Sequence, residues 1–329
     1  MDWKGKKVLV TGAGGFIGSH LVEKLVSLGA KTFAFVRYNS RNNRGLLEIL
    51  SKDIQQEIEV IMGELRDPES VRSAVKNKQI VLHLGASIAI PYSYINPRDA
   101  VETNIVGTLN ILTSARDYEV ERIIQTSSSE VYGTALYSPI DENHPLQGQS
   151  PYSASKIGAD KLAESFYLSY NLPVSILRPF NTYGPRQSAR AVIPTIITQA
   201  LKFNKIKLGS LHPTRDFNYV DDTVNGFIKI SESPNTIGEV INVGTGKDVS
   251  IGELVYKIMS IMGKQLEIET DDQRIRPPAS EVLKLIADYS KAKELMDWEP
   301  QISLDEGLAR TINWFSNFLD RYKIDSYNV

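Results

Sequence analysis

Cysteine is absent from the 329 residues of this chain. Disulfide bonds and thiolate chemistry are therefore excluded, and a reducing compartment is the simplest setting. The 37 basic and 39 acidic residues nearly balance, and no basic stripe indicates a nucleic-acid partner. No apolar run approaches the length of a membrane span or of a signal-peptide core. We expect a cytoplasmic protein with no membrane partner.

A glycine-rich turn near the amino terminus lies between an apolar strand predicted at 6–11 and an amphipathic helix that Gly29 ends. Strand, glycine turn and helix together are typical of a dinucleotide site. The glycines let the backbone approach a pyrophosphate, whose charge binds the free N–H groups of the helix start. A glycine turn with no ligand is the alternative. The candidate cofactor contacts are Gly12, Gly14, Gly15, Phe16, Ile17 and Gly18.

The second predicted strand, at 31–36, is followed by basic and polar residues. An acidic residue at this point would accept the ribose hydroxyls of NAD. Arg37 and Arg41, with Asn39 and Ser40, suit a 2′-phosphate instead, which favours NADP while leaving NAD possible. The alternative interpretation is a solvated basic loop.

Two further predicted strands, at 58–62 and 80–84, bring more residues to the same cofactor. Glu64 and Leu65 are expected near the adenine. Leu84 is followed by Gly85 and Ala86, whose small side chains leave room for the nicotinamide side.

Several other features predict structure rather than chemistry. His83 is flanked by leucines and has no second metal ligand at a suitable spacing, so we expect a packed structural histidine and no metal site. The remaining expectations concern helix starts: a cap at Asp67, a start at Asn104, caps at Asp221 and Asp222, and a capping box from Ser250 to Glu253.

The stretch from 126 to 156 carries the catalytic candidates. A strand predicted at 123–126 delivers Ser128 and Glu130 at its carboxyl end, where open α/β sheets bind ligands. Tyr152 and Lys156 follow, and on a helix their spacing places both on one face, one turn apart. A cation beside a tyrosine lowers the phenol pKa, so the phenolate can take a proton from an alcohol. A surface tyrosine and lysine on an ordinary helix are the alternative.

Five motifs occur in order: TGxxGxxG at 11–18, HLGA at 83–86, SSSEVYG at 127–133, YSASK at 152–156 and RPFNTYGPR at 178–186. Together they resemble the extended short-chain dehydrogenase/reductases that act on nucleotide sugars, over nearly the whole chain. The resemblance implies an α/β fold, with a Rossmann doubly wound parallel sheet and a smaller discontinuous α/β substrate domain. It assigns 1–178 and about 215–245 to the dinucleotide-binding domain, and 179–214 and about 246–329 to the nucleotide-sugar domain.

The resemblance also implies catalytic roles. Tyr152 becomes the base, Ser128 the hydrogen-bond partner of the sugar hydroxyl, and Lys156 the group that holds the nicotinamide ribose. Glu130 matches the glutamate of sugar-nucleotide 4,6-dehydratases that removes the C5 proton. The dTDP-glucose branch has an aspartate proton donor where this chain has Ser129. The GDP-mannose branch has a serine there, so Glu130 is expected to serve as both base and acid.

Other activities fit the same motifs. UDP-glucuronate decarboxylases share the Ser-Glu pair, although no arginine for the substrate carboxylate is evident here. Nucleotide-sugar 4-epimerases share the serine, tyrosine and lysine but do not need Glu130. A non-catalytic dinucleotide-binding sensor is the alternative from another class of protein.

Longer stretches are similar to the 4,6-dehydratases of bacterial legionaminic acid synthesis, which implies a lyase of cell-surface polysaccharide biosynthesis. Among them are IAIPYSY at 88–94 and HPLQGQSPYSASKIGADK at 144–161. The implied substrate is GDP-N-acetylglucosamine, with a UDP-linked sugar as the alternative. Helices near 104–115 and 153–170 imply a homodimer, or a homotetramer. The implied substrate contacts are Ser87, Ser129, Asn181, Val192, Arg215, Arg276 and Glu281.

Overall fold

The structure is a computed structural model that describes residues 1–324. Its central element is a seven-stranded sheet in the order β11–β6–β5–β4–β1–β2–β3, with every neighbouring pair parallel. The order reverses between β1 and β4, which is where doubly wound sheets bind their ligands. The predicted Rossmann fold is therefore confirmed. The strands are β1 (Lys7–Thr11), β2 (Lys31–Arg37), β3 (Ile58–Gly63), β4 (Ile80–His83), β5 (Arg122–Thr126), β6 (Val174–Pro179) and β11 (Val240–Val243).

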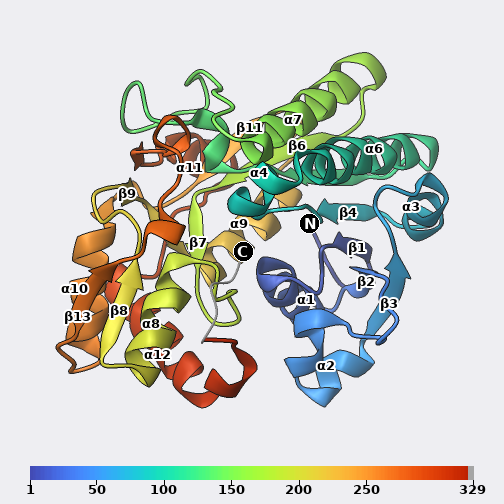
Figure 1. Ribbon diagram of the computed structural model, residues 1–329. Helices are drawn as coiled ribbons and strands as arrows, with labels where there is room; N and C mark the ends of the chain where they lie inside the picture. Colours follow the sequence, from blue (N-terminus) through green and yellow to red (C-terminus); the bar gives the residue numbers. More distant parts are fainter. Residues whose placement is uncertain (325–329) are drawn as a thin grey trace.

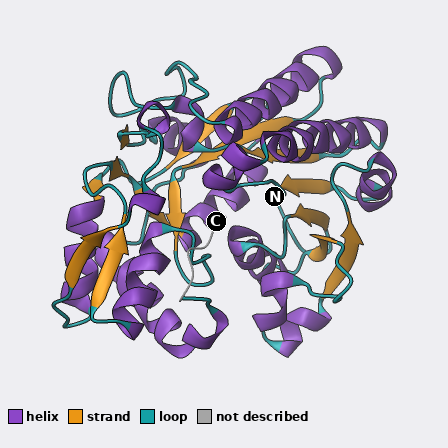
Figure 2. Ribbon diagram, viewed as in Figure 1, coloured by secondary structure: helices purple, strands orange, loops and turns teal. Residues whose placement is uncertain are grey.

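Helices cover both faces of this sheet (Figures 1 and 2). Val8 and Val10 of β1 belong to one core with α1 and α9, while Leu9 faces a second core with α3, α6 and α7. This alternation follows from the two-residue period of a strand. Because both faces of the sheet are covered, most strand residues are apolar. The helices are α1 (Phe16–Ser27), α3 (Pro68–Val75), α6 (Gly107–Asp117), α7 (Pro151–Tyr170), α9 (Val220–Glu232) and α11 (Ser290–Met296).

A second group of elements, coloured yellow to red in Figure 1, gathers beside the carboxyl ends of the strands. Its strands form small sheets of two or three strands rather than one large sheet. Its strands are β7 (Asn181–Tyr183), β8 (Lys205–Leu208), β9 (Thr214–Arg215), β10 (Phe217–Tyr219), β12 (Val249–Ser250), β13 (Glu267–Thr270) and β14 (Lys284–Leu285). Its helices are α8 (Val192–Lys202), α10 (Ile251–Ile261) and α12 (Leu304–Asn317).

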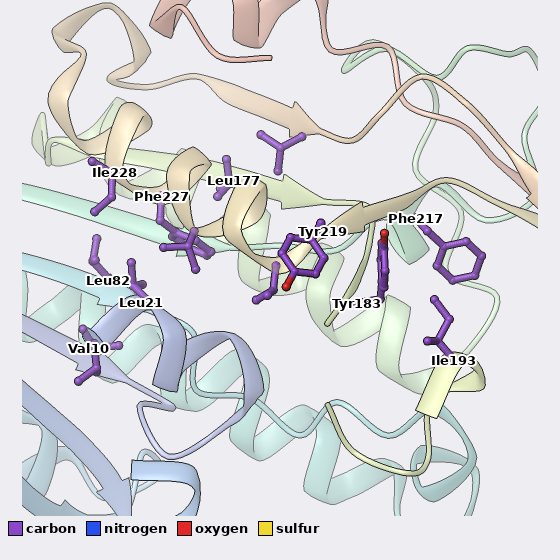
Figure 3. Close-up of a cluster of buried hydrophobic side chains, with 14 of the residues drawn as sticks. Val10, Leu21, Leu82, Leu177, Tyr183, Ile193, Phe217, Tyr219, Phe227 and Ile228 are labelled. Atoms are coloured by element: carbon purple, nitrogen blue, oxygen red, sulfur yellow. The ribbon is translucent and has the colours of Figure 1, made fainter. Parts of the chain in front are cut away.

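One apolar core joins this group to the main sheet (Figure 3). Tyr183 and Tyr219 lie between the two parts, with ring centroids 5.6 Å apart in an edge-to-face arrangement. Phe227 of α9 and Leu82 of β4 belong to the same cluster. Because the packing is continuous, the walls of any cleft between the parts are supported from both sides.

Several helix starts agree with the sequence. Asp67 caps α3 by accepting from the Glu69 N–H, and Ser250 forms the capping box with Glu253 at the start of α10. The helix with Tyr152 and Lys156 also forms, and Ser150 caps it. The short helices α2 (Lys52–Gln56) and α4 (Ile90–Ile95) and several 3-10 turns lie between the longer elements.

Two helix starts were predicted wrongly. The helix expected from Asn104 begins earlier, as α5 (Pro97–Val101), and continues through a π-helical turn, 102–106, into α6. Pro97 at the first helical position suits an earlier start. Asp221 and Asp222 lie inside the first turn of α9 rather than capping it. Asp222 instead accepts a hydrogen bond from the Ile302 N–H. The local sequence does not predict this contact, because the two residues lie 80 positions apart.

No helix within residues 1–324 is both long enough and apolar enough to span a bilayer.

His83 is a packed histidine, as expected, and its charge state gives a testable pH dependence. The ring lies between Thr11 and Thr108 at 2.7 and 3.1 Å, and burial lowers its pKa to about 3. Below its unfolded pKa of about 6.5, the unfolded chain therefore binds a proton that the folded chain rejects. Stability contributed by this site is present above that pH and is lost toward pH 3, by about 1.4 kcal/mol per pH unit.

Replacing His83 with Gln should therefore flatten the dependence of the unfolding free energy on pH between about 6.5 and 4. His20, whose pKa burial and the charge of Arg186 lower to about 4, should retain part of the slope. Urea unfolding at a series of pH values measures this difference. His212→Gln, at an exposed position, is the matched control. Equal slopes in wild type and His83→Gln would contradict the prediction.

Candidate active site

A cleft of about 1050 Å³ lies at the carboxyl ends of the strands and receives residues from both parts of the fold. The glycine turn after β1 forms one wall, and β7, β9 and the start of α8 contribute to the opposite wall. The cleft therefore coincides with the ligand-binding edge of a doubly wound sheet. Predicted residues that line it are Gly12, Gly14, Gly15, Phe16, Ile17, Gly18, Arg37, Asn39, Leu84, Ala86, Ser128, Ser129, Glu130, Tyr152, Lys156, Asn181, Val192, Arg215, Arg276 and Glu281.

The glycine turn forms a cradle that larger residues would fill. A Cβ on Gly12 would lie 2.8 Å from the Gly85 nitrogen, and one on Gly14 would lie 2.7 Å from the Arg44 carbonyl oxygen. Helix α1 begins with Gly15 as its N-cap and has no side-chain cap within the described chain. Its first N–H groups therefore remain available to an anion, as a dinucleotide pyrophosphate requires.

The loop after β2 closes over this turn. Leu46 N–H donates to the Gly14 carbonyl at 2.9 Å, and a Cβ on Gly45 would lie 2.4 Å from the same oxygen. Three residues that were not among the predicted cofactor contacts also line the cleft here: Asn43, Arg44 and Gly45. The sequence offered one local indication of this loop, a glycine that follows Asn and Arg after the basic end of β2. Its contact with Gly14 is tertiary, so the local pattern alone does not predict it.

A smaller cavity of about 190 Å³ adjoins the cleft and shares Gly12, Arg37 and Ala86 with it. Four more predicted residues line it: Glu64, Leu65, Gly85 and Ser87. Ser87 was expected on the substrate side, but here its hydroxyl donates to Asp99 at 2.9 Å. Ser40 and Arg41 are exposed and border neither cavity in the described part of the chain.

The four catalytic candidates come from two elements. Strand β5 ends at Thr126, and the following turn presents Ser128 and Glu130, whose N–H donates to the Ser128 hydroxyl oxygen at 3.2 Å. Helix α7 presents Tyr152 and Lys156, and its capping box at Ser150 sets where the helix starts. All four line the same cleft.

The electrostatics of the tyrosine differ from the expectation. Burial raises the pKa of Tyr152 to about 12, although a hydrogen bond with Ser128 works in the opposite direction. The prediction of a lowered phenol pKa is thus wrong for the polypeptide alone, because burial dominates and the charges of Glu130 and Asp160 also raise the pKa. Lys156 donates to the Thr126 carbonyl at 2.5 Å, and burial lowers the pKa of its ammonium to about 8.

The opposite wall carries basic residues around one carboxylate. Glu281 lies 3.4 Å from Arg215 and 3.8 Å from Arg276. Burial lowers the pKa of Arg215, while the nearby Glu130 and Glu281 raise it. Arg215 is thus close enough to Glu130 to respond to its charge. This wall suits a phosphate-bearing ligand, because a guanidinium forms paired hydrogen bonds to phosphate oxygens.

A buried carboxylate holds this wall in place, and a buried amide oxygen on it lacks a partner in the described chain. The neighbouring Asp216 carboxylate accepts from the N–H groups of Thr245, Gly246 and Ala287, which fixes β9 and its arginine. The side-chain oxygen of Asn181 is buried and has no hydrogen-bond partner within the described chain, although the residue lines the cleft. A buried acceptor without a partner costs stability unless a ligand donates to it.

No cluster of acidic or histidine side chains within residues 1–324 has the geometry of a metal site.

Comparison with known proteins places this geometry in a family. The family model described as GDP-mannose 4,6 dehydratase matches residues 9–311. The chain belongs to this family of extended short-chain dehydrogenase/reductases. This is an enzyme family of nucleotide-sugar dehydratases and epimerases.

The relatives of this chain carry the names of different enzymes. A UDP-glucose 4-epimerase of Mycolicibacterium smegmatis is 32% identical, covering 94% of this chain and 99% of that protein. The human dTDP-D-glucose 4,6-dehydratase is 28% identical, covering 97% and 92%. The solved dTDP-glucose 4,6-dehydratase of Streptomyces venezuelae with NAD and TYD bound superposes with a TM-score of 0.86, at 28% identity and coverage of 96% and 98%. Family membership thus supports a nicotinamide dinucleotide as cofactor.

Proposed function

We propose that this chain is a nucleotide-sugar 4,6-dehydratase that converts GDP-N-acetylglucosamine to the 4-keto-6-deoxy sugar. The observation that carries the proposal is the position of Glu130. It lines the same cleft as Ser128, Tyr152 and Lys156, and it lies within electrostatic range of Arg215. Oxidation at C4 alone needs no carboxylate at this point, whereas loss of water between C5 and C6 needs an acid–base group.

The cofactor site fits a nicotinamide dinucleotide, since the glycine cradle and the uncapped start of α1 suit its pyrophosphate. We assign the cofactor contacts to the glycine turn, to Arg37 and Asn39, and to the smaller cavity with Glu64 and Leu65. When bound, the cofactor would supply temporary hydride storage, so the reaction would have no net redox change.

The side chains of the chain then supply the proton transfers. Tyr152 removes the C4 hydroxyl proton, with Ser128 orienting that hydroxyl and Lys156 holding the ribose beside it. The resulting 4-keto group acidifies the C5 hydrogen, which Glu130 removes. Glu130 gives a proton to the leaving C6 hydroxyl, because Ser129 replaces the aspartate donor of the dTDP-glucose branch. Water leaves, and a proton is returned to C5 as the hydride reaches C6.

We assign the diphosphate to the basic wall. Arg215 and Arg276 are the phosphate contacts, with Asn181 and Val192 beside them. Glu281, now between the two arginines, is assigned to the nucleoside ribose. The guanine base and the N-acetylglucosamine unit are supported by the similarity to the legionaminic acid dehydratases, at IAIPYSY and HPLQGQSPYSASKIGADK.

A 4-epimerase is the second candidate, because the relative from Mycolicibacterium smegmatis carries that name. Ser128, Tyr152 and Lys156 suffice for it, since the hydride then returns to C4 rather than C6. A UDP-glucuronate decarboxylase also forms a 4-keto sugar, and it needs an arginine for the substrate carboxylate. Arg215, whose pKa the charge of Glu130 raises, is a candidate for that contact.

Mass spectrometry of GDP-N-acetylglucosamine incubated with the protein, without added reductant, tests the proposal. A product lighter by one water, with no net cofactor reduction, is the expected result. Water loss only from UDP-N-acetylglucosamine or GDP-mannose would support a 4,6-dehydratase but contradict the proposed substrate. A product of unchanged mass with inverted configuration at C4 would indicate a 4-epimerase instead. Release of carbon dioxide from UDP-glucuronate would indicate a decarboxylase. Tight cofactor binding with no turnover of any sugar would favour the sensor.

We propose NADP as the preferred cofactor, on the strength of Arg37. Its side chain is 76% exposed at the end of β2, borders both cavities, and lies 3.5 Å from Glu64. Replacing Arg37 with Asp should weaken NADP about 10- to 100-fold and spare NAD, since a charge-assisted bond to the 2′-phosphate is lost. Fluorescence titration with both reduced cofactors measures this. Lys31→Asp, at the exposed opposite end of β2, is the control. A wild type that prefers NAD would contradict the prediction.

We propose that two copies associate through α6 and α7, as a homodimer or as half of a homotetramer. Apolar side chains are exposed along these helices and the turn before them, at Val106, Leu109 and Leu168. Exposed apolar groups gathered on one face mark association surfaces. Sedimentation velocity tests the proposal, and a monomer at micromolar concentration would overturn it.

A further inference from the structure

One buried carboxylate has no role in the reaction proposed above. Asp160 lies on α7, one turn beyond Lys156 and two turns beyond Tyr152, and it has no exposed surface. Its Oδ2 accepts from the Nε and Nη2 atoms of Arg178 at 3.2 and 3.0 Å. Arg178 lies on the adjacent strand β6 and is 2% exposed. This is a buried ion pair on the same face of α7 as Tyr152 and Lys156.

The carboxylate side of the pair holds the residue that precedes the catalytic serine. The Ser127 hydroxyl donates to Asp160 Oδ2 at 2.6 Å. The Ser127 N–H also donates to the Leu177 carbonyl at 2.8 Å, next to Arg178 on β6. Ser127 is therefore fixed through both its backbone and its side chain. This sets the direction in which the chain continues to Ser128.

The guanidinium side of the pair holds the other end of the same segment. Arg178 Nη1 donates to the Tyr132 hydroxyl oxygen at 3.0 Å, and the guanidinium lies 5.0 Å from the centre of the Tyr132 ring. The Tyr132 hydroxyl in turn donates to Asn242 on β11 at 2.8 Å. Tyr132 ends the 3-10 turn Ser129–Tyr132 that carries Glu130. It is fully buried, so water does not compete for these contacts.

We propose that the Asp160–Arg178 pair is a positioning device that clamps both ends of the six-residue segment 127–132 and so sets where Ser128 and Glu130 stand. The proposal rests on the dehydratase function, which requires those two groups to act on neighbouring sugar atoms in turn. Asp160 and Arg178 touch neither cleft nor reacting atoms, and they act through Ser127 and Tyr132.

Stability alone does not account for such a pair. Two charges taken out of water lose their hydration, and apolar residues of similar volume in their place are often neutral or stabilising. A buried polar network instead fixes one geometry, because each hydrogen bond is directional and the interior has a low dielectric constant. Here the three hydrogen bonds converge on Asp160 Oδ2, while Oδ1 is buried with no partner in the described chain. A turn that must hold two reacting groups gains from this restriction, since small misplacements of a reacting group cost large factors in rate.

The same carboxylate acts on the charge of the catalytic lysine. Burial lowers the pKa of Lys156, and the Asp160 charge opposes this effect. His83 on β4 also responds to the charge of that ammonium. Tyr152 lies one turn before Lys156 on α7, and Glu130 lines the same cleft. Removing the Asp160 charge should therefore lower the pH above which Lys156 loses its proton.

Asp160→Asn tests the clamp in the whole protein. Hydrogen–deuterium exchange of peptides covering 127–132 should accelerate, and kcat should fall about 100-fold while KM changes little. The alkaline limb of the kcat profile should move to lower pH, a shift that loose packing alone does not produce. The double variant Asp160→Leu with Arg178→Met removes both charges, so it keeps the fold if the single variant unfolds. It should show the same exchange and loss of kcat.

Asp222→Asn is the matched control, because Asp222 is also a buried carboxylate, and its hydrogen bonds with the backbone of Ile302 and Gln301 involve a distant part of the sequence. It should lower the melting temperature without changing exchange at 127–132. Unchanged exchange in Asp160→Asn, or the same kcat loss in the control, would overturn the clamp. If wild type turns over no nucleotide sugar, the dehydratase function fails, but the exchange comparison still decides whether the pair orders the segment.

Discussion

Glu130→Gln should abolish water loss from the nucleotide sugar while cofactor binding stays intact. The amide keeps the size of the side chain on the turn after β5, but it can neither take the C5 proton nor return one to the C6 hydroxyl. Positioned acid–base groups contribute about 10²- to 10⁴-fold, and one residue here performs both transfers. We therefore expect the upper part of that range.

The variant should also separate the two halves of the reaction. Tyr152 and Lys156 remain, so C4 oxidation should proceed and reduced cofactor should accumulate, visible by its near-ultraviolet absorbance. Wild type should instead exchange the C5 hydrogen with solvent deuterium, which nuclear magnetic resonance of the product detects. Glu164→Gln, a partly exposed carboxylate on α7 that pairs with Lys161, is the control. Full activity in Glu130→Gln would remove the proposed base and favour a 4-epimerase.

Tyr152→Phe should stop the reaction one step earlier, at oxidation of C4. Without the phenol oxygen nothing accepts the C4 hydroxyl proton, so a fall of about 10²- to 10⁴-fold is expected and no reduced cofactor should form in a single turnover. This failure before oxidation distinguishes the variant from Glu130→Gln. Accumulation of reduced cofactor by Tyr152→Phe would contradict the assignment.

The pKa of Tyr152 adds a second readout. Burial holds it at about 12, so the phenol of the polypeptide alone stays protonated at neutral pH. A base at neutral pH needs a lower value, which a bound nicotinamide cation would supply as a nearby positive charge. Binding of oxidised cofactor should therefore release protons in wild type but not in Tyr152→Phe. Calorimetry in buffers of different ionisation enthalpy measures the release. Equal release by both proteins would assign the protons elsewhere.

Local patterns predicted the nucleotide half of the fold closely. The strand at 6–11, the glycine turn and the helix that stops at Gly29 are all present, with Gly29 at φ +78° just after the helix. Asp67 and Ser250 cap their helices as expected. These features depend on a few adjacent residues, so a single chain suffices to predict them. The caps expected at Asp221 and Asp222 are wrong because helix α9 already begins at Val220. Asp222 accepts instead from the Ile302 N–H, 80 positions away.

The sequence by itself determined which residues reach the carboxyl edge of the sheet, because strand ends and helical spacing are local properties. It thereby brought Ser128, Glu130, Tyr152 and Lys156 to one region. Only the tertiary structure decided their environment. The high pKa of Tyr152 and the approach of Arg215 to Glu130 depend on burial and on contacts between distant segments. So does the Asp160–Arg178 clamp, whose partners come from α7, β6 and the turn after β5. No periodicity encodes such contacts, since they exist only once those elements pack.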